Sequence, residues 1–471
     1  MEYLMTYGWA ILIVAVVLGA LYSLGIFNGS NFLGGTCVAA PGYLCSNPLL
    51  STSGTLSLTY GYQGPNVTIV GFACTNTTTA PSSFASSGSS DLQPGQEESI
   101  SVSCPLPSGA TIGTPYSGYL WVEYDQAGQS DLIARFATVR STASTSAVPQ
   151  FSVISNVPVG TEPYYATYDS GDGYIYVTNY GSDTVSVLSG TSIVNTVTVG
   201  SNPYYATYDS GDGYVYVSNE GSGTVSVLSG TSVVNTVTVG SGPHYAAYDP
   251  SNGYIYVPNV NSGTVSVISG TSVVNTVTVE TNPYYATYDS GDGYVYVTNY
   301  GSDTVSVLSG TSFVNTVTVG LGPYFAPYDS GNGYIYVVNL NSGTVSVLSG
   351  TSVVNTVTVG SSPYFATYDP SNGYVYVSNR GSGTVSVISG TSVVNTVTVG
   401  STPEFTTYNP GNGYIYVPNL NSDTLSVLSG TSVVNTVTVG LVPVAAAYDS
   451  GNGYVYVTNS GSGTVSVIRT T

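Results

Sequence analysis

The sequence predicts a mainly β fold, and three observations support this prediction. A 40-residue unit recurs eight times after residue 162, and each copy contains GYVYVxN or GYIYVxN. Each unit holds four strand-like runs, A to D, which read PYYATYD, YVYVSN, TVSVLS and VVNTVTV in the second copy. The 57 Gly and 44 Tyr residues, with much Ser, Thr and Val, favour strands and tight turns. Four short strands at this period are typical of a propeller blade, so the predicted fold class is an eight-bladed β-propeller with four-stranded blades.

The charge pattern limits the possible partners. The 471-residue chain is long enough for two or three domains, has no Lys, and carries a formal net charge of −20. Nucleic acid is excluded as a partner because phosphate binding needs clustered Lys and Arg. Only 6% of the residues are charged. Acid has few groups to protonate in such a chain, which suggests an acidic habitat as a hypothesis.

Residues 1–28 predict a transmembrane anchor. The uncharged run from Tyr7 to Phe27 would span roughly 30 Å as a helix, the thickness of a bilayer core. Tyr7 and Trp9 lie at one end of the run, as interfacial aromatic residues do. A cleaved signal peptide would have a basic start, a shorter apolar core and a small-residue cleavage site. A retained single span is therefore favoured.

The run EYLMTYGWA at residues 2–10 resembles the N-terminus of archaeal type IV pilin-like proteins, and the resemblance extends over about 27 residues. In that family a Glu lies near the start of a hydrophobic helix, and a peptidase cuts just upstream. The basic leader and the Gly before the cut are missing here. The resemblance implies a pilin-like anchor and makes a filament subunit an alternative role.

Cysteines and sequons indicate that the bulk of the chain is extracellular. The four cysteines are Cys37, Cys45, Cys74 and Cys104, and the N-x-S/T sequons are at Asn28, Asn66 and Asn76. Four cysteines in one small region suit two disulfides in an oxidising compartment, and the sequons suit glycosylation. Three pairings are possible. Proximity favours Cys37–Cys45 with Cys74–Cys104, and a zinc site is the alternative.

Residues 36–141 do not repeat and predict a small β-sandwich of roughly five to seven strands. The strand-like runs are TLSLTYGY, NVTIVGFACT, ESISVSC, GYLWVEYD and LIARFATVR, and turn-rich stretches such as TAPSSFASSGSSDLQPGQ separate them. The expected role is a disulfide-bonded stalk above the membrane. Residues 142–150 are expected to link it to a propeller at 151–471.

The repeats resemble the YVTN family of β-propellers, which is common in archaeal and bacterial surface proteins. The matching residues in the second repeat are Pro203, 216–219, 224–227 and 236–240, and the resemblance covers about 320 residues. It implies the propeller fold, although the family is usually seven-bladed and the repeat count here predicts eight. It implies no particular function, because propellers host many.

The propeller is expected to be closed by a strand that precedes the first repeat. FSVISNVPVG at 151–160 matches D-strand sequences such as TSIVNTVTVG at 191–200, and the last repeat stops after its C strand, TVSVI at 464–468. The early D strand should therefore pair with the last C strand. Closure would remove exposed strand edges that invite aggregation. The alternative is an open, solenoid-like array.

Differences among the repeats gather on one rim. In an antiparallel meander the D–A and B–C turns share one rim, here called the variable rim, and the nearly identical A–B and C–D turns share the other, the uniform rim. Three columns of the variable rim differ between repeats. They contain Glu162 and Glu280 in the D–A turns, Tyr164, Tyr204, His244, Tyr284, Tyr324, Tyr364 and Glu404 at the start of strand A, and Tyr180, Glu220, Tyr300 and Arg380 in the B–C turns.

These thirteen residues are the candidate ligand-binding site. One interpretation is free drift of rim loops, and the other is a binding rim on a rigid scaffold. A ring of tyrosines edged by carboxylates would suit a sugar or an extended peptide, because Tyr offers flat amphipathic contact area. No metal or cofactor is expected. The Asn that ends each B strand and the Asp of each A–B turn are expected to bond turn backbone, and a calcium loop is disfavoured because the other ligands are missing.

The favoured function is a membrane-anchored surface protein for recognition or adhesion that binds protein or glycan. A pilin-like or surface-layer component is the structural alternative. A propeller enzyme, such as a hydrolase or lyase, is less favoured, because the propeller has one His and no Lys or Cys for a triad or a multi-histidine metal site. A carboxylate pair involving Glu162 or Glu404 would be the remaining catalytic possibility.

Overall fold

The computed structural model describes residues 36–41, 43–51, 54–62, 66–92, 97–107, 114–126, 129–144 and 151–470. The chain divides into two compact units, and the boundary in the sequence falls between Gln150 and Phe151, where the propeller was predicted to begin. The predicted anchor at residues 1–28, including the Asn28 sequon, lies outside the described residues. Among the described residues, no helix is long and apolar enough to cross a membrane.

The first unit contains more strands in its described part than the apolar runs predict. The eight strands are β1 (Thr36–Ala39), β2 (Tyr43–Ser51), β3 (Thr55–Tyr62), β4 (Val67–Thr75), β5 (Ala85–Leu92), β6 (Glu97–Ser103), β7 (Pro115–Gln126) and β8 (Gln129–Ser144). Strand β5 runs through the Ser-rich stretch interpreted as a separator, and pairs with β4. Strand β8 includes residues 142–144 of the predicted linker. Neighbouring strands supply the hydrogen bonds of such segments, so local composition does not reveal them.

The core of this unit is formed by side chains of β3, β4, β7 and β8, among other strands. Tyr60 of β3 packs edge-on against Phe72 of β4, with ring centroids 4.7 Å apart, and lies 5.9 Å from Phe136 of β8. Leu120 and Val122 of β7 are fully buried in the same cluster. Strand order is β5-β4-β7-β8-β2-β3-β6, and β2 joins β8 through only two parallel residue pairs.

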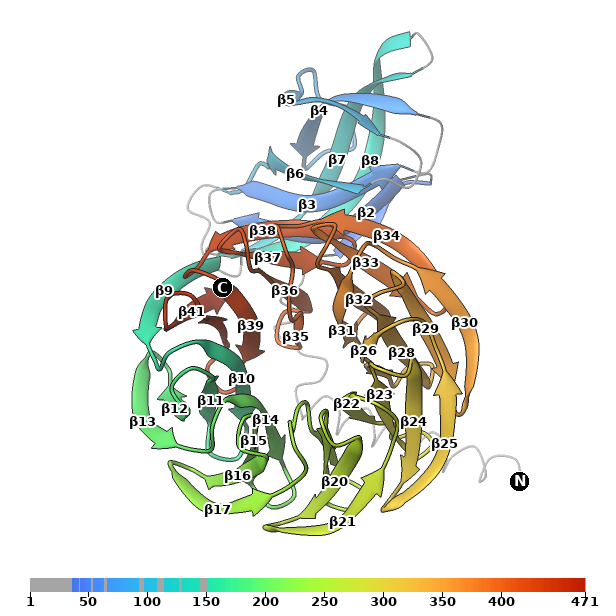
Figure 1. Cartoon of the computed structure of the whole chain (residues 1–471). Helices are drawn as coiled ribbons and strands as arrows, with labels where there is room; N and C mark the ends of the chain where they lie inside the picture. The colour runs from blue at the N-terminus through green and yellow to red at the C-terminus, as the bar shows by residue number, and fades with distance from the viewer. Residues whose placement is uncertain are drawn as a thin grey trace, which may run out of the picture. The chain divides into compact units, whose positions relative to one another are not determined.

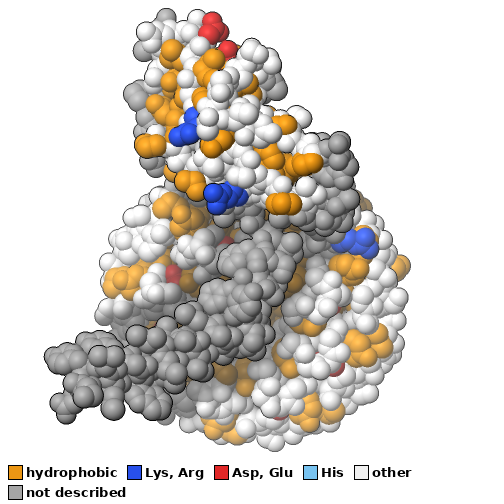
Figure 2. All heavy atoms as spheres, turned by 180° about the vertical axis from the view of Figure 1, so that it is seen from behind, with side chains coloured by type: hydrophobic (Ala, Val, Ile, Leu, Met, Phe, Trp, Pro, Cys, Tyr) orange, Lys and Arg blue, Asp and Glu red, His pale blue; other side chains and the backbone are white. Residues whose placement is uncertain are grey.

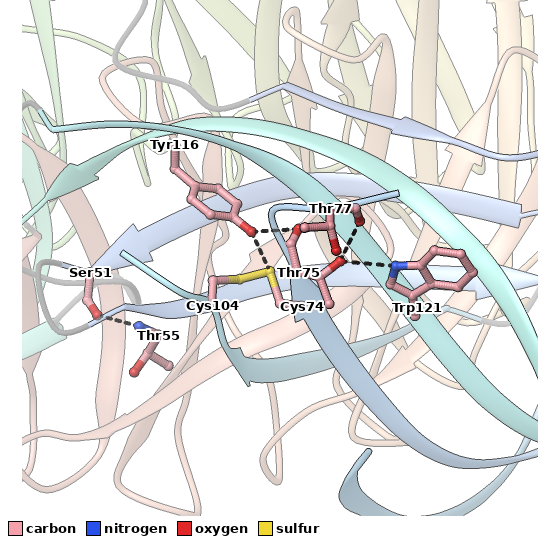
Figure 3. Close-up of a disulfide and its surroundings, with 8 residues drawn as sticks. All are labelled: Ser51, Thr55, Cys74, Thr75, Thr77, Cys104, Tyr116 and Trp121. Carbon is pink, nitrogen blue, oxygen red and sulfur yellow. Dashed lines mark hydrogen bonds between the residues drawn. A yellow bond between two sulfur atoms is a disulfide. The ribbon is translucent and has the colours of Figure 1, made fainter. Parts of the chain in front are cut away.

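Both favoured disulfides are present, Cys37–Cys45 and Cys74–Cys104. Figure 3 shows the second, which ties the end of β4 to the segment after β6. The Tyr116 hydroxyl lies 3.1 Å from Cys74 Sγ and donates to the Thr75 carbonyl over 3.1 Å. The sequon residues Asn66 and Asn76 are both exposed.

The second unit consists of repeated antiparallel sheets, one for each repeat, which have four strands each except the fifth, where the A strand is divided into two (Figure 1). The sheets are formed, in chain order, by β10 (Pro163–Asp169), β11 (Tyr174–Asn179), β12 (Thr184–Ser189) and β13 (Ser192–Thr198); β14 (Pro203–Asp209), β15 (Tyr214–Asn219), β16 (Thr224–Ser229) and β17 (Ser232–Thr238); β18 (Ala247–Asp249), β19 (Tyr254–Asn259), β20 (Thr264–Ser269) and β21 (Ser272–Thr278); β22 (Pro283–Tyr288), β23 (Val295–Asn299), β24 (Thr304–Ser309) and β25 (Ser312–Thr318); β26 (Pro323–Phe325), β27 (Tyr328–Asp329), β28 (Tyr334–Asn339), β29 (Thr344–Ser349) and β30 (Ser352–Thr358); β31 (Pro363–Asp369), β32 (Tyr374–Asn379), β33 (Thr384–Ser389) and β34 (Ser392–Thr398); β35 (Thr407–Asn409), β36 (Tyr414–Asn419), β37 (Thr424–Ser429) and β38 (Ser432–Thr438); and β39 (Pro443–Tyr448), β40 (Tyr454–Asn459), β41 (Thr464–Thr470) and β9 (Phe151–Pro158). The sheets form a ring with their A strands nearest the centre and their D strands outermost.

The early D strand closes this ring. Strand β9 pairs antiparallel with β41, with Val157 opposite Val465, and Ser466 Oγ donates to Asn156 Oδ1 over 2.7 Å. The first repeat packs against the last, because Thr458 Oγ1 donates to the Tyr164 carbonyl over 3.1 Å. The predicted pairing is therefore confirmed, and the outer edge of β41 is not left open.

The repeat-invariant residues hold the sheets together. Tyr176 and the residues beside it in β11 are fully buried, as expected for packing between adjacent blades. The Asp prediction is confirmed, because Asp169 Oδ1 accepts the Gly171 amide over 2.7 Å. The Asn prediction is wrong: Asn179 Nδ2 donates to Thr184 Oγ1 and Ser186 Oγ on the C strand, each over 3.0 Å, and not to turn backbone.

Candidate binding rim

The D–A and B–C turns lie side by side, as the meander predicts. In the first repeat the backbone N–H of Tyr180 donates to the carbonyl of Glu162 over 2.9 Å. In the sixth repeat the N–H of Arg380 donates to the carbonyl of Ser362 over 3.0 Å. These bonds use no side-chain atoms, so the residues of the variable rim can change without breaking them.

The uniform rim has a structural reason to be uniform. The Tyr176 hydroxyl lies 2.6 Å from Asp172 Oδ2 and 2.9 Å from the carbonyl oxygen of Gly230 in the next repeat, and it can donate to either. The tie to the next repeat recurs at Tyr216 and Tyr336. A substitution there would break a contact between blades, which is reason enough for these residues to be the same in each repeat. Variation on one rim is therefore not by itself evidence for a ligand.

In the first six repeats, the residue after the proline that precedes or opens strand A is aromatic, and these side chains form a stack along the ring. Neighbouring centroids are 4.3–4.7 Å apart along the series Tyr164, Tyr204, His244, Tyr284, Tyr324 and Tyr364. His244, Tyr324 and Tyr364 are buried, and Tyr164, Tyr204 and Tyr284 are partly exposed. These candidate ligand-binding side chains therefore pack largely against one another.

A second aromatic layer, which was not predicted from the sequence, lies behind the first. It is formed by the next residue along the chain in the first seven repeats, namely Tyr165, Tyr205, Tyr245, Tyr285, Phe325, Phe365 and Phe405. Phe405 contacts members of both layers, with centroids 5.9 Å from Tyr164 and 4.8 Å from Phe365. It also lies 6.0 Å from Tyr245, which comes from the third repeat. Side chains from the third and seventh repeats therefore meet in the middle of the ring.

Two prolines account for this meeting. In the first repeat Tyr165 pairs with Thr178 of strand B. The residues equivalent to Thr178 in the third and seventh repeats are Pro258 and Pro418, which have no N–H to offer strand A. The A strands β18 and β35 are correspondingly short there, and begin after Tyr245 and Phe405. The two prolines were the available sequence signal for this central packing.

The tyrosine hydroxyls near the centre bond one another. The Tyr164 and Tyr204 hydroxyls are 2.8 Å apart, and those of Tyr324 and Tyr364 are 2.9 Å apart. Burial raises the pKa of the Tyr204 and Tyr324 hydroxyls well above the usual value. These groups stay protonated at physiological pH, so they form a neutral hydrogen-bonded layer and not a charged one.

Glu404 is a buried carboxylate beneath an exposed arginine. Its side chain is 2% exposed, and its Oε1 lies 2.9 Å from Nε of Arg380, whose side chain is 41% exposed. The Arg380 guanidinium also lies over the Tyr364 ring, 4.9 Å from the centroid. Burial raises the pKa of Glu404 to about 7, and the Arg380 charge opposes that rise. Arg380 is thus held in one position by a carboxylate and an aromatic face.

At the equivalent position between the second and third repeats, the acidic and the basic residue are exchanged. There the B–C residue is Glu220 and the A-strand residue is His244, with Glu220 Oε1 3.5 Å from His244 Nε2. The Tyr180 hydroxyl donates to Glu220 Oε2 over 3.1 Å. The hydrogen bond from His244 is the main reason that the pKa of Glu220 is lowered.

The remaining candidates lie on the outer part of the rim. Glu162 and Glu280 are exposed, and Tyr180 and Tyr300 are partly exposed. Two further rim residues, Leu321 and Leu441, are each 55% exposed and were not among the predicted ligand contacts. Their signal was that both stand where the other six repeats have Ser or Thr. The face seen in Figure 2 carries few charged side chains, as expected for a chain in which 6% of the residues are charged.

Within the described part of the chain, no three His, Cys, Asp or Glu side chains gather in a way that could hold a metal ion. The glutamates of the rim lie in different repeats, and the cysteines are all in disulfides.

Comparisons with known proteins show the fold. No protein-family description matches the chain, and no curated protein matches it. Among solved structures, the dihydro-heme d1 dehydrogenase NirN in complex with DHE is 13% identical, with a TM-score of 0.52, and the match covers 70% of this chain and 81% of that one. Virginiamycin B lyase from Staphylococcus aureus is 12% identical, with a TM-score of 0.49, and covers 57% and 95%. The WD40 β-propeller domain of Doa1 is 16% identical, with a TM-score of 0.44, and covers 54% and 88%.

The chain is therefore a β-propeller protein with an additional β unit before the propeller. At these identities the likeness extends to the fold alone. Because NirN is a dehydrogenase by name, membership of this fold does not argue against catalysis.

Proposed function

We propose that this protein is a membrane-anchored, extracellular recognition or adhesion protein, and that the variable rim of an eight-bladed propeller binds a surface protein or glycan. The observation that carries the proposal is the set of chemically varied side chains that are exposed on this rim. Glu162 and Glu280 project carboxylates, Arg380 a cation, and Leu321 and Leu441 apolar surface. Such residues on a rigid scaffold are typical of a binding face.

The contact surface in this proposal is the outer part of the rim. Glu162, Tyr180, Glu220, Glu280, Tyr300 and Arg380 would contact the ligand. Tyr164, Tyr204 and Tyr284 would line its inner edge, and His244, Tyr324, Tyr364 and Glu404 would support it from below.

The remaining parts of the proposal rest on the sequence. A pilin-like helix at residues 1–28 would anchor the chain in the cell membrane as a single span, and the first β unit would serve as the stalk. Its two disulfides and exposed sequons at Asn66 and Asn76 suit an oxidising exterior. Membership of the YVTN family and an archaeal source belong to this proposal as well.

The test is binding of the full-length chain, held in detergent, to a panel of glycans and cell-surface proteins. The rim variant is Tyr180→Ser with Tyr300→Ser, because Ser460 already occupies the same B–C position in the last repeat. The control is Val194→Ser with Val274→Ser, which changes exposed residues on the outer D strands, 45% and 49% exposed. Binding lost only in the rim variant supports the proposal, and binding kept in both contradicts it.

One observation favours a second candidate, a propeller hydrolase or lyase. A carboxyl group with a pKa of about 7 lies in the range suited to general acid–base catalysis, and Glu404 is such a group. Its 2% exposure leaves little access for a substrate. Turnover of a glycan that disappears in Glu404→Gln would make this the better account. Filaments containing the chain in electron micrographs would favour the pilin-like structural role.

A further inference from the structure

The variable rim is divided into two chemically different halves. In the first four repeats its outer residues include Glu162, Tyr180, Glu220, Glu280 and Tyr300. In the last four repeats they include Leu321, Leu340, Arg380, Leu420 and Leu441. Every rim glutamate with an exposed or partly exposed side chain is therefore in one half, and the only rim Arg and all the rim leucines are in the other.

The two exposed leucines are not needed by the fold. Leu321 and Leu441 are each 55% exposed, in D–A turns whose equivalents carry Ser or Thr in the other six repeats. The backbone bond that holds the turn is the same with either kind of residue: the N–H of Leu340 donates to the Gly322 carbonyl over 2.9 Å, as the N–H of Arg380 does to Ser362. Large apolar side chains kept at such positions are typical of an interaction surface.

Arg380 lies between these leucines along the ring, and the exposed part of its side chain can bind a second anion. Its Nε faces Glu404, and its plane lies over Tyr364, yet 41% of the side chain remains exposed. Among residues 151–470 the only other basic side chains are His244, which is buried, and Arg469, at the end of a C strand away from this rim.

We propose that the variable rim binds a second copy of this chain face to face, with the leucine and arginine half of each copy on the acidic half of the other. This inference rests on the proposed function and specifies its partner, so that adhesion would be homophilic. Two identical faces that meet about a two-fold axis run in opposite directions around the ring. When repeats five to eight cover repeats one to four, the sixth repeat faces the third. Arg380 then lies opposite the stretch flanked by Glu220 and Glu280 of the second copy, and both leucines are covered.

The net charge predicts how salt acts on this contact. Each chain carries a formal charge of −20, so two copies repel each other over a distance that salt shortens. Association through the leucines should therefore become stronger as salt is added, at least until the Arg380 contacts are screened. A contact dominated by ion pairs would weaken from the start.

The experiment measures self-association of the full-length chain, incorporated singly into nanodiscs, by sedimentation velocity over a range of concentration and salt. The leucine variant is Leu321→Ser with Leu441→Ser, and the acid variant is Glu162→Arg with Glu280→Arg. We expect each variant to weaken the dimer at least about tenfold. The control pair Val194→Ser with Val274→Ser should leave the dissociation constant unchanged.

Mixing the two variants tests the half-to-half arrangement. A mixed pair retains one intact contact, between the acidic half of the leucine variant and the leucine half of the acid variant. The mixed dimer should therefore form more tightly than the average of the two variant homodimers. No gain on mixing, or a dimer that neither variant weakens, overturns the inference. A chain that is monomeric at all concentrations yet binds a panel ligand through the rim also overturns it, and leaves the proposed function standing.

Discussion

Glu404 provides the most direct test of the rim structure, through the substitution Glu404→Gln. The pKa of this carboxyl group is raised from 4.5 to about 7 by burial. An acid with a raised pKa binds its proton more tightly in the folded chain than in the unfolded one. Its contribution to stability is therefore greatest at low pH and is lost as the pH rises from the unfolded pKa through the folded one. Each pH unit of displacement is worth about 1.4 kcal/mol, so the loss approaches about 3 kcal/mol.

Glutamine keeps the shape of the side chain and removes its titration. We expect the free energy of unfolding of Glu404→Gln, minus that of the unchanged protein, to rise by about 3 kcal/mol between roughly pH 4 and pH 8. Because only the change with pH is used, any constant cost of the buried amide cancels. Arg380 would lose its partner, at small cost for a side chain that is 41% exposed.

Urea denaturation of the full-length chain at several pH values measures this difference, with Glu162→Gln as the control because that carboxylate is exposed on the same rim. A difference for Glu404→Gln that does not change with pH would refute the reasoning. It would mean that burial does not raise the pKa of Glu404, either because the carboxyl group is less buried than in the structure or because the Arg380 charge cancels the rise.

Three further predictions concern the propeller as a whole. Burial raises the pKa of Asp169, Asp209 and Asp289 in the A–B turns. Together with Glu404 these groups should make the fold more stable as pH falls from neutral, while Glu220 opposes the trend; melting curves that collapse between neutral pH and about pH 3 would contradict this. Val157→Ala in the closing strand should lower the free energy of unfolding by about 2 kcal/mol, because the side chain is buried against β41. Val197→Ala, at the same position of an internal D strand, should lower it by about as much. If Val157→Ala has no effect on stability, the ring is open. Gly240→Ala should lower the free energy of unfolding by about 1–3 kcal/mol, since the added carbon would lie 2.7 Å from two carbons of the buried Asn259. The substitution Ser241→Ala at the exposed neighbouring position is the control and should change the stability little. Equal losses of stability in the two variants would refute the steric argument.

The strands and their closure could be predicted because their causes are local and repeated. Alternation of apolar residues identified β3, β4, β6, β7 and β8 to within a few residues. A count of strands was enough to match β9 with β41, because an unpaired D strand and an unpaired C strand remained. Strand β5 could not be found in this way, since a Ser- and Gly-rich segment becomes a strand only when β4 offers it hydrogen bonds.

The candidate site was predictable in position but not in burial. The antiparallel order of strands determined which turns share a rim, and the structure has them there. Whether Tyr164 or Tyr324 faces solvent depends on how far apart the A strands are across the ring, a property of all the repeats together. The positions of Tyr245 and Phe405 depend in addition on Pro258 and Pro418, each of which acts through a neighbouring strand.

The sequence by itself determined the strand pattern, the repeat, the closing strand and the two rims of this propeller, because these follow from periodicity along one chain. Only the tertiary structure decided that the aromatic side chains at the centre stack on one another, that Glu404 is buried beneath Arg380, and that Leu321 and Leu441 stay exposed. The physical reason is that burial and pairing belong to side chains brought together from repeats that are distant in sequence, whereas strand formation is specified largely within each repeat.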